Sequence, residues 1–160
     1  MTNVQFCSGG SRIPGWINSD LEHGDMKIDI TQRLPFEDNY VDACRIEHGA
    51  EHVTTHECLR FFDEVHRILK PGGTFRLCIP VLDALVAGPR KIGMAPEHAR
   101  DLVFGHGHQC AFTKQLAYIF LRLAGFIIIL HSERDPHDQH WKVIGEEKDT
   151  LETARFIATK

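Results

Sequence analysis

The chain has 160 residues, of which 42% are hydrophobic and 25% are charged, the proportions of an average soluble globular protein. These values exclude disordered, collagen-like and coiled-coil classes and predict a single domain over residues 1–160. A formal net charge of −4 excludes the basic surface that neutralises many phosphates, so we expect no nucleic-acid partner.

The cysteines and the apolar runs predict a cytoplasmic protein. The five cysteines are scattered and form no C-x-x-C pair, which indicates neither a disulfide framework nor a thiolate zinc site. The longest apolar run, residues 126–130, is far shorter than the roughly 20 residues that span a bilayer. The N-terminus lacks the basic start and apolar core of a signal peptide, so we expect no membrane partner.

Short β-rich runs alternate with helical patterns along the chain. The candidate strands are residues 4–7, 16–19, 27–30, 41–46, 74–79, 126–131 and 154–159. Most are continuous apolar runs, which are typical of parallel strands buried on both faces. The pattern predicts an α/β domain with a mainly parallel sheet.

Two helices are indicated by an apolar stripe and by their caps. Residues 55–69 carry one stripe, Thr54 and Glu57 form a capping box, and the Lys-Pro-Gly-Gly of residues 70–73 ends the helix. A second helix is capped at Thr113 and ends at Gly125. Its predicted buried face consists of Leu116, Ile119, Phe120 and Leu123. The segment 82–104, rich in turn residues, predicts two short helical pieces that face the substrate.

The first crossovers are too short for helices. Parallel strands normally need a dozen or more residues between them, yet residues 9–15 are fewer, and residues 20–27 and 30–41 lack helical periodicity. We therefore expect one face of the sheet to be thinly covered and to expose apolar residues. A homodimer would cover that face, and the segment 82–104 folding back over it is the alternative.

Glycines and two aspartates are placed at the predicted strand ends. Residues 6–10 read Phe-Cys-Ser-Gly-Gly, and glycines there let the backbone approach a ligand at the carboxyl edge of the sheet. Asp20 ends the second strand, where a carboxylate can accept hydrogen bonds from both hydroxyls of a ribose. Asp29 ends the third strand, where a carboxylate can accept one from an amine such as that of adenine.

Further motifs follow in a fixed order. They are the Pro-Gly-Trp turn of residues 14–16, the Leu-Pro-Phe of residues 34–36, the Glu-His-Gly-Ala-Glu-His of residues 47–52 and the His-Arg-Ile-Leu-Lys-Pro-Gly-Gly of residues 66–73. Together with the Gly-Gly loop and the two aspartates, this set resembles the class I S-adenosylmethionine-dependent methyltransferases over nearly the whole chain.

The resemblance implies a compact Rossmann-like sheet of seven strands, mostly parallel with one antiparallel strand, and S-adenosylmethionine as cofactor. By position, Ser8, Gly9 and Gly10 would line the methionine moiety and Asp20 would bind the ribose. Asp29 and Ile30 would border the adenine, and Glu47 and His48 would form the wall next to the sulfonium. The implied function is methyl transfer to a small-molecule or sugar-like acceptor. Cys7 replaces the glycine that is usual at its position, and its side chain is expected to crowd the cofactor.

The histidines leave two further roles open. His48, His52 and His56 are spaced i, i+4, i+8, which would align three imidazoles on one helix, but Gly49 and the cap at Thr54 break such a helix. We therefore predict no metal site. His106 and His108 flank a glycine in a loop, and we name His108 as the candidate general base for a hydroxyl or amine acceptor.

Two other functions remain open at this point. A non-catalytic binding module of the same fold is favoured by Cys7 and by the compressed first crossover. A nicotinamide-binding protein is disfavoured, because the G-x-G-x-x-G pattern and its helix are missing.

Overall fold

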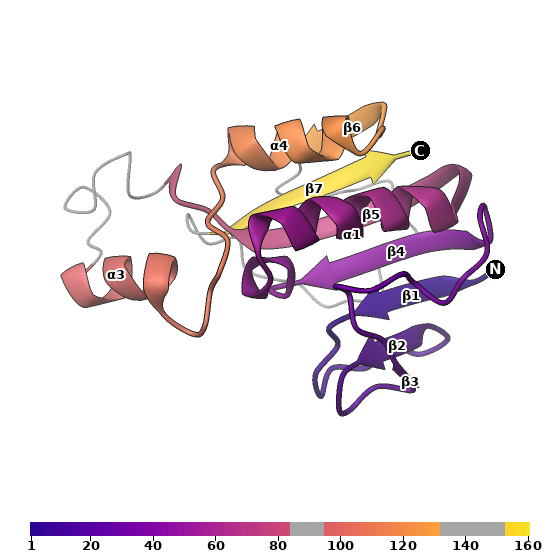
Figure 1. The fold of residues 1–160 in the computed structure, drawn as a ribbon, viewed down its shortest axis with the longest axis horizontal. Coiled ribbons are helices and arrows are strands. Elements are labelled where there is room, and N and C mark those ends of the chain that lie inside the picture. The colour runs from indigo at the N-terminus through magenta and orange to yellow at the C-terminus, as the bar shows by residue number, and fades with distance from the viewer. Residues whose placement is uncertain (84–94, 132–152) are drawn as a thin grey trace.

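The computed structural model describes residues 1–83, 95–131 and 153–160, and in these ranges seven strands form one sheet (Figure 1). The order across the sheet is β3-β2-β1-β4-β5-β7-β6. The bounds are β1 Asn3–Phe6, β2 Ile17–Asp20, β3 Met26–Lys27, β4 Val41–Glu47, β5 Leu69–Pro80, β6 Ile128–His131 and β7 Thr153–Thr159. Strands β1 to β5 pair in parallel, and β7 runs antiparallel to both of its neighbours. The predicted seven-stranded sheet with one antiparallel strand is confirmed.

The helix α1 (Thr55–Ile68) connects β4 to β5 as predicted. Its capping box is present, because the Thr54 side chain accepts a hydrogen bond from the Glu57 backbone and Glu57 Oε2 accepts one from Thr54 N at 2.9 Å. The helix is preceded by a short 3-10 turn, η1 (Ala50–His52). The described residues also contain α3 (Pro96–Phe104) and α4 (Lys114–Leu123).

Aromatic rings fill the space between α1 and the sheet. Phe6 of β1 meets Phe61 of α1 edge to face at a ring-centroid distance of 5.2 Å, and Phe75 of β5 meets Phe62 at 5.5 Å. Phe126, which precedes β6, stacks on Phe75 at 5.8 Å. All five rings are buried, so this cluster is the centre of the core.

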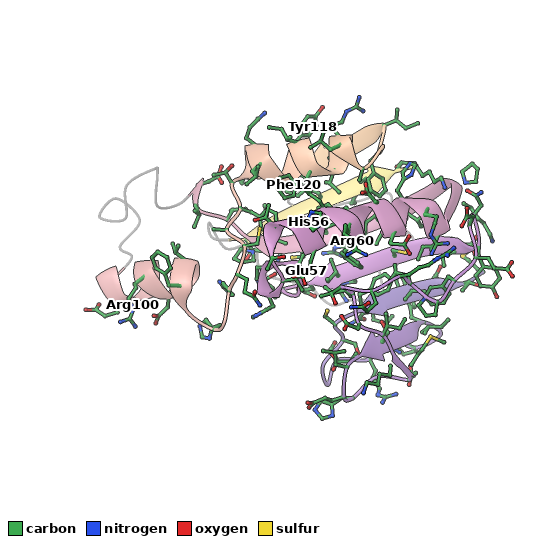
Figure 2. All side chains as sticks on the ribbon, in the orientation of Figure 1. His56, Glu57, Arg60, Arg100, Tyr118 and Phe120 are labelled. Carbon is green, nitrogen blue, oxygen red and sulfur yellow. The ribbon has the colours of Figure 1, made fainter. Side chains whose placement is uncertain are left out.

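The helix α4 is found where predicted, but its buried face is rotated. Thr113 caps the helix by accepting a hydrogen bond from Leu116 N at 3.1 Å. Ile119 and Leu123, predicted to be buried, are 41% and 69% exposed. The buried residues are Ala117, Phe120 and Leu121, and Figure 2 shows the exposed Tyr118 on the same helix. The prediction overlooked Ala117, whose small side chain lets the helix lie close to the core.

No helix occurs in the described chain between β1 and β4, which confirms the short crossovers. The buried Asn18 holds the first two connections instead. Its Oδ1 accepts a hydrogen bond from Ile13 N at 2.8 Å, and its Nδ2 donates to Trp16 O at 3.1 Å. The same Nδ2 donates to Asp25 Oδ2 at 2.9 Å, and Arg12 forms an ion pair with Asp25. One amide side chain therefore ties together two loops.

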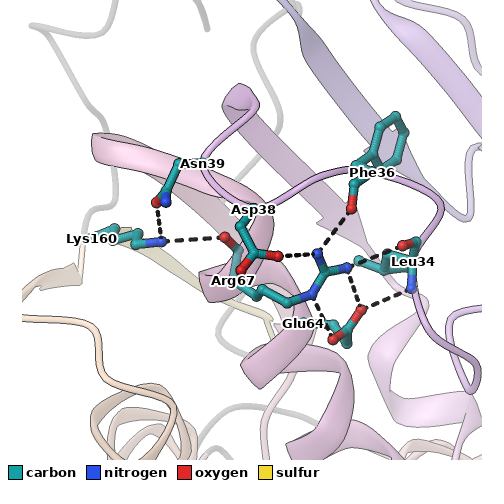
Figure 3. A network of polar contacts seen from close by, with 7 residues as sticks. All are labelled: Leu34, Phe36, Asp38, Asn39, Glu64, Arg67 and Lys160. Carbon is teal, nitrogen blue, oxygen red and sulfur yellow. Dashed lines mark hydrogen bonds and ion pairs between the residues drawn. The ribbon is translucent and has the colours of Figure 1, made fainter.

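Arg67 holds the connection between β3 and β4 (Figure 3). Its Nη1 donates to Phe36 O at 2.9 Å and to Asp38 Oδ1 at 2.7 Å, and its Nη2 donates to Leu34 O at 3.1 Å. Glu64, one turn earlier on α1, accepts from Arg67 Nε at 2.8 Å and from Leu34 N at 2.9 Å. The segment that carries the Leu-Pro-Phe motif is therefore fixed to α1 by charged and polar groups.

Across β1, β4 and β5, the sheet face opposite α1 carries a row of polar side chains where exposed apolar residues were expected. Phe6 and Phe75 contact α1, so their strand neighbours point to the other face. Register places Gln5, Arg45 and Arg76 in one row across β1, β4 and β5 on that face. Gln5 and Arg45 in this row are buried. The homodimer stays a prediction.

The segment 82–104 is only partly described. Of the two helical pieces predicted within residues 82–104, α3 is the second, while residues 84–94 lie outside the described ranges. Among the described residues, no helix is both long enough and apolar enough to cross a membrane.

Candidate functional site

The carboxyl ends of β1, β2 and β4 bring the predicted site residues to one edge of the sheet. The loop after β1 is joined to the end of β2 by two hydrogen bonds. Ser8 N donates to Ser19 O at 2.9 Å, and Gly9 N donates to Asp20 Oδ2 at 2.9 Å. The glycine loop and Asp20 therefore form one unit.

The glycine loop leaves space beside its backbone. Gly9 has φ +51°, a left-handed conformation that favours glycine. No heavy atom lies within 4 Å of the position that a Cβ on Gly9 or Gly10 would occupy. A ligand can therefore approach this backbone closely.

Asp20 ends β2 as predicted, and its surroundings keep it ionised. Hydrogen bonds from Glu22 N at 3.1 Å and from Gly9 N lower the pKa of the Asp20 carboxyl below its ordinary value. Each carboxylate oxygen accepts one of these bonds and retains a lone pair. Asp20 can therefore accept further hydrogen bonds from a ligand diol.

Asp29 does not end a strand, which corrects the prediction. The edge strand β3 is only Met26–Lys27, so Asp29 lies two residues beyond it. Asp29 Oδ1 accepts hydrogen bonds from Thr31 N at 2.9 Å and from Thr31 Oγ1 at 2.7 Å. This local turn competes with strand pairing and ends the extended conformation early. Ile30, its predicted partner at the adenine, is buried next to it.

Cys7 lies among three acidic residues of the site. Burial is the main cause that raises the pKa of its thiol to about 12, and the negative charges of Asp20, Glu51 and Asp29 contribute to the same shift. Cys7 has φ +51°, and a Cβ at Gly49 would lie 2.7 Å from the Cβ of Cys7. The Cys7 side chain thus packs closely against the Gly49 backbone.

Glu47 and His48 stand at the end of β4, where the chain turns sharply. Glu47 forms an ion pair with Arg45, on the same face of the strand. His48 has φ +48°, and its backbone N–H donates to Cys78 O at 3.0 Å. The His48 ring is about half exposed and faces the carboxylate of Glu51, with Nδ1 3.4 Å from Oε1.

The structure places His108, the predicted base, beside residues that the sequence analysis did not select. Gln109 N and Cys110 N donate to Glu51 O at 2.8 and 3.1 Å, which fixes the loop against η1. The rings of His108 and His52 meet edge to face at 5.1 Å. The predicted break of the helix between His52 and His56 is confirmed, since η1 ends at His52 and α1 begins at Thr55.

Glu51 was the residue that sequence reasoning missed. Its side chain is only 1% exposed, in a segment that begins with Gly49 and Ala50. A charged residue that follows two small ones and precedes a helix cap is usually solvated, so the pattern gave no sign of burial. The signal that existed was the pair of histidines at positions 48 and 52, which flank it.

Comparison with known proteins gives one match in sequence and many in structure. Residues 16–77 match the family model described as a methyltransferase domain. This range begins at the Pro-Gly-Trp turn and includes Asp20, Asp29 and α1. No curated protein sequence matches the chain.

Solved structures show the same fold at low identity. An S-adenosylmethionine-dependent methyltransferase from Thermotoga maritima, described as a possible histamine N-methyltransferase, is 18% identical with a TM-score of 0.65, and the match covers 99% of this chain and 82% of that one. A putative methyltransferase in complex with the Trm112 activator from Haloferax volcanii is 15% identical with a TM-score of 0.64, over 99% and 81% of the two chains. A methyltransferase from Mesorhizobium loti is 18% identical with a TM-score of 0.63, over 99% and 90%.

The sequence match and the strand order agree with the predicted resemblance. The sequence match rests on residues 16–77, and the neighbours add the fold of the whole chain. Residues 16–77 thus match a methyltransferase domain, and the described chain has the fold of S-adenosylmethionine-dependent methyltransferases.

Proposed function

We propose that the chain binds S-adenosylmethionine across the carboxyl ends of β1, β2 and β4 and transfers its methyl group to a small-molecule acceptor. The observation that carries this proposal is the joined unit of the open glycine loop and the ionised Asp20. A glycine backbone with free space beside it suits the methionine moiety, and a carboxylate with remaining lone pairs suits a ribose diol. The residues present therefore fit the cofactor.

The remaining cofactor contacts are assigned by position. Ser8 and Gly10 line the methionine moiety with Gly9, and Glu47 and His48 stand next to the sulfonium. The Ser8 hydroxyl supports this assignment, because it is buried and has no hydrogen-bond partner among the described residues. Such a group is usually satisfied by a ligand or by water.

The adenine end rests on Asp29 and Ile30. Asp29 uses Oδ1 for the turn with Thr31, and Oδ2 remains to accept a hydrogen bond from the adenine amine. Ile30 supplies an apolar surface for the ring. This assignment is independent of strand β3, because the turn itself presents the carboxylate.

For methyl transfer, the protein mainly has to align the acceptor with the cofactor. The cofactor supplies an activated methyl group, and its transfer is an in-line displacement. The residues of this chain have to hold the acceptor in line and exclude water. The general-base role of His108 stays a prediction, and its place beside η1 keeps it at the β4 end of the site.

The acceptor is proposed to be a small or sugar-like molecule. The net charge of −4 and the carboxylates of Glu47 and Glu51 disfavour a polyanionic acceptor. The Thermotoga maritima protein described as a possible histamine N-methyltransferase illustrates an amine acceptor on this fold. A cytoplasmic location and a homodimer stay predictions.

The test is turnover. Purified chain is incubated with S-adenosylmethionine and, separately, with a panel of primary amines and of sugars, and S-adenosylhomocysteine is quantified by mass spectrometry. We expect product above the acceptor-free background with at least one acceptor class, and loss of that product in Asp20→Ala. Cofactor binding without turnover on any acceptor would instead support the non-catalytic binding module.

A further inference from the structure

The carboxylate of Glu51 is buried and accepts no hydrogen bond from the described residues. Its side chain is 1% exposed, and neither Oε1 nor Oε2 has a hydrogen-bond partner within residues 1–83, 95–131 and 153–160. Transferring an ionised carboxylate out of water is strongly unfavourable unless a cation or donors compensate it. Nearly all buried polar groups in folded proteins have such a partner. The position of Glu51 therefore calls for a cation.

Imidazoles surround this carboxylate. His48 Nδ1 lies 3.4 Å and His52 Nε2 lies 4.0 Å from Glu51 Oε1. One ligand atom from each of Glu51, His52 and His108 lies within 4.8 Å of the other two. These distances bring a carboxylate oxygen and two imidazole nitrogens, the ligands that zinc prefers besides thiolates, to one point.

The backbone holds the two segments of this cluster together. Gln109 N and Cys110 N donate to Glu51 O, and Gln109 Nε2 donates to His52 O at 2.8 Å. The loop that carries His108 is thus fixed to the backbone carbonyls of both Glu51 and His52 in η1. The approach of His108 to His52 follows from these bonds and does not depend on side-chain rotation alone.

We propose that Glu51, His52 and His108 bind a divalent transition-metal cation, with Zn²⁺ as the reference ion. Ligand bonds of about 2.0 to 2.2 Å in tetrahedral geometry separate ligand atoms by about 3.4 Å. Glu51 Oε1 and His52 Nε2 lie 4.0 Å apart and the three ligand atoms lie within 4.8 Å of one another, so the separations exceed this value by roughly 1.4 Å at most. The rings of His52 and His108 are partly exposed, and the proposal requires them to rotate toward Glu51. Three protein ligands leave a fourth position open.

A second group, Glu47, His48 and Cys78, has similar spacing but fits a metal less well. Glu47 already forms an ion pair with Arg45, and Cys78 is completely buried. The proposal is therefore confined to the Glu51 group.

This inference goes beyond methyl transfer and changes the role of one residue. A ring nitrogen that binds a metal has no lone pair left to accept a proton. His108 then acts as a ligand in place of the predicted general base. Because Cys7, which precedes the glycine loop, packs against Gly49, two residues before Glu51, the metal would lie close to the proposed cofactor site, at its β4 end.

The experiment is a calorimetric titration of the full chain with Zn²⁺, without cofactor, after treatment with a chelator. Variants Glu51→Gln, His52→Ala and His108→Ala are compared with His56→Ala, a matched control whose exposed ring lies on α1 outside the cluster (Figure 2). We expect one site in the parent and the control, and affinity lower by about 100-fold or more in the other three, since even outer partners of a ligand contribute about 10- to 100-fold. A Co²⁺ spectrum without a sulfur charge-transfer band then excludes the cysteines as ligands.

A second readout separates ligand loss from misfolding. Zn²⁺ should raise the melting temperature of the parent and of His56→Ala but not of Glu51→Gln, because only the folded, liganded site is stabilised. The proposal is wrong if the parent shows no stoichiometric site, or if Glu51→Gln binds Zn²⁺ as tightly as the parent. S-adenosylmethionine titrated into the chelator-treated protein reports on the proposed function separately, so either proposal can fail alone.

Discussion

The two halves of the sheet are held in different ways. From β4 onward, α1 packs Phe61 and Phe62 against Phe75 of β5, which stacks on Phe126, and Phe6 of the neighbouring β1 joins this aromatic cluster. From β1 to β4, loops replace the crossover helices, and Asn18 and Arg67 fix them through hydrogen bonds and ion pairs.

The difference bears on the site, because the cofactor edge lies where the two halves meet. The glycine loop and Asp20 belong to the polar half, and Glu51 with its histidines belongs to the start of the helical half. Apolar packing is non-directional, whereas hydrogen bonds fix particular atoms. We call Asn18 and Arg67, which each hold several loop groups by such bonds, the polar hubs. We infer that the polar hubs set the geometry of the site and that the aromatic cluster supplies most of the stability.

The largest expected effect comes from the aromatic half. Phe75→Ala removes a fully buried ring that contacts Phe62 and Phe126. We expect the free energy of unfolding to fall by about 3 to 5 kcal/mol. Urea denaturation followed by circular dichroism measures this change. If Phe75→Ala lowered the free energy of unfolding by less than Arg67→Met or Asn18→Ala, the aromatic cluster would not supply most of the stability.

Arg67→Met should have the next largest effect. It removes the donors to Leu34, Phe36 and Asp38 and leaves the half-buried Glu64 without its cation. We expect a loss of about 2 to 3 kcal/mol. Arg67→Lys should recover little of it, since an ammonium cannot donate in several fixed directions. Arg60→Met, on the exposed side of α1, is the control and should change stability little (Figure 2).

Asn18→Ala should lower the free energy of unfolding by about 1 to 3 kcal/mol, and we expect its effect to be confined to the first two connections of the sheet. The change leaves Ile13 N without its acceptor and frees the loop that contains Asp25. Hydrogen exchange measured by mass spectrometry should speed up over residues 7–27 and leave α1 protected. Equal acceleration in both regions would show that the first crossovers are not an independent unit.

The smallest effect is a pH dependence in the helical half. Burial lowers the pKa of His66, and the nearby Lys160 lowers it further, while Asp63 and the Gly125 backbone oppose this shift. As pH falls, the unfolded chain therefore takes up the proton on His66 before the folded chain does. The contribution of neutral His66 to the free energy of unfolding is complete above its ordinary pKa of 6.5 and is lost as pH falls below that value. Melting temperatures from pH 8 to 5.5 should fall less steeply in His66→Gln than in the parent. Equal slopes of melting temperature against pH in His66→Gln and the parent would show that His66 does not cause the pH dependence.

The sequence predicted the features that depend on local pattern. The seven-stranded sheet with one antiparallel strand follows from the resemblance, and α1 follows from its stripe together with Thr54 and Glu57. The end of β2 at Asp20 was also predicted, because the strand is flanked by turn residues.

The errors arise where a distant or small partner decides the outcome. The face of α4 depends on how closely Ala117 approaches the core, and the length of β3 depends on the turn that Asp29 forms with Thr31. Asn18 and Arg67 look like surface residues in the sequence, because their partners lie in other segments. The burial of Glu51 likewise depends on the loop of His108, which is far away along the chain.

The central claim is that S-adenosylmethionine binds at the joined glycine loop and Asp20, and calorimetric titration of the cofactor into Asp20→Ala tests it most directly. Two charge-assisted hydrogen bonds to the ribose are worth roughly 3 kcal/mol or more together, so the account predicts affinity at least about 100-fold lower than in the parent. Glu22→Gln, which removes an exposed carboxylate two residues away, should bind like the parent. Equal cofactor affinity in Asp20→Ala and the parent would contradict the account.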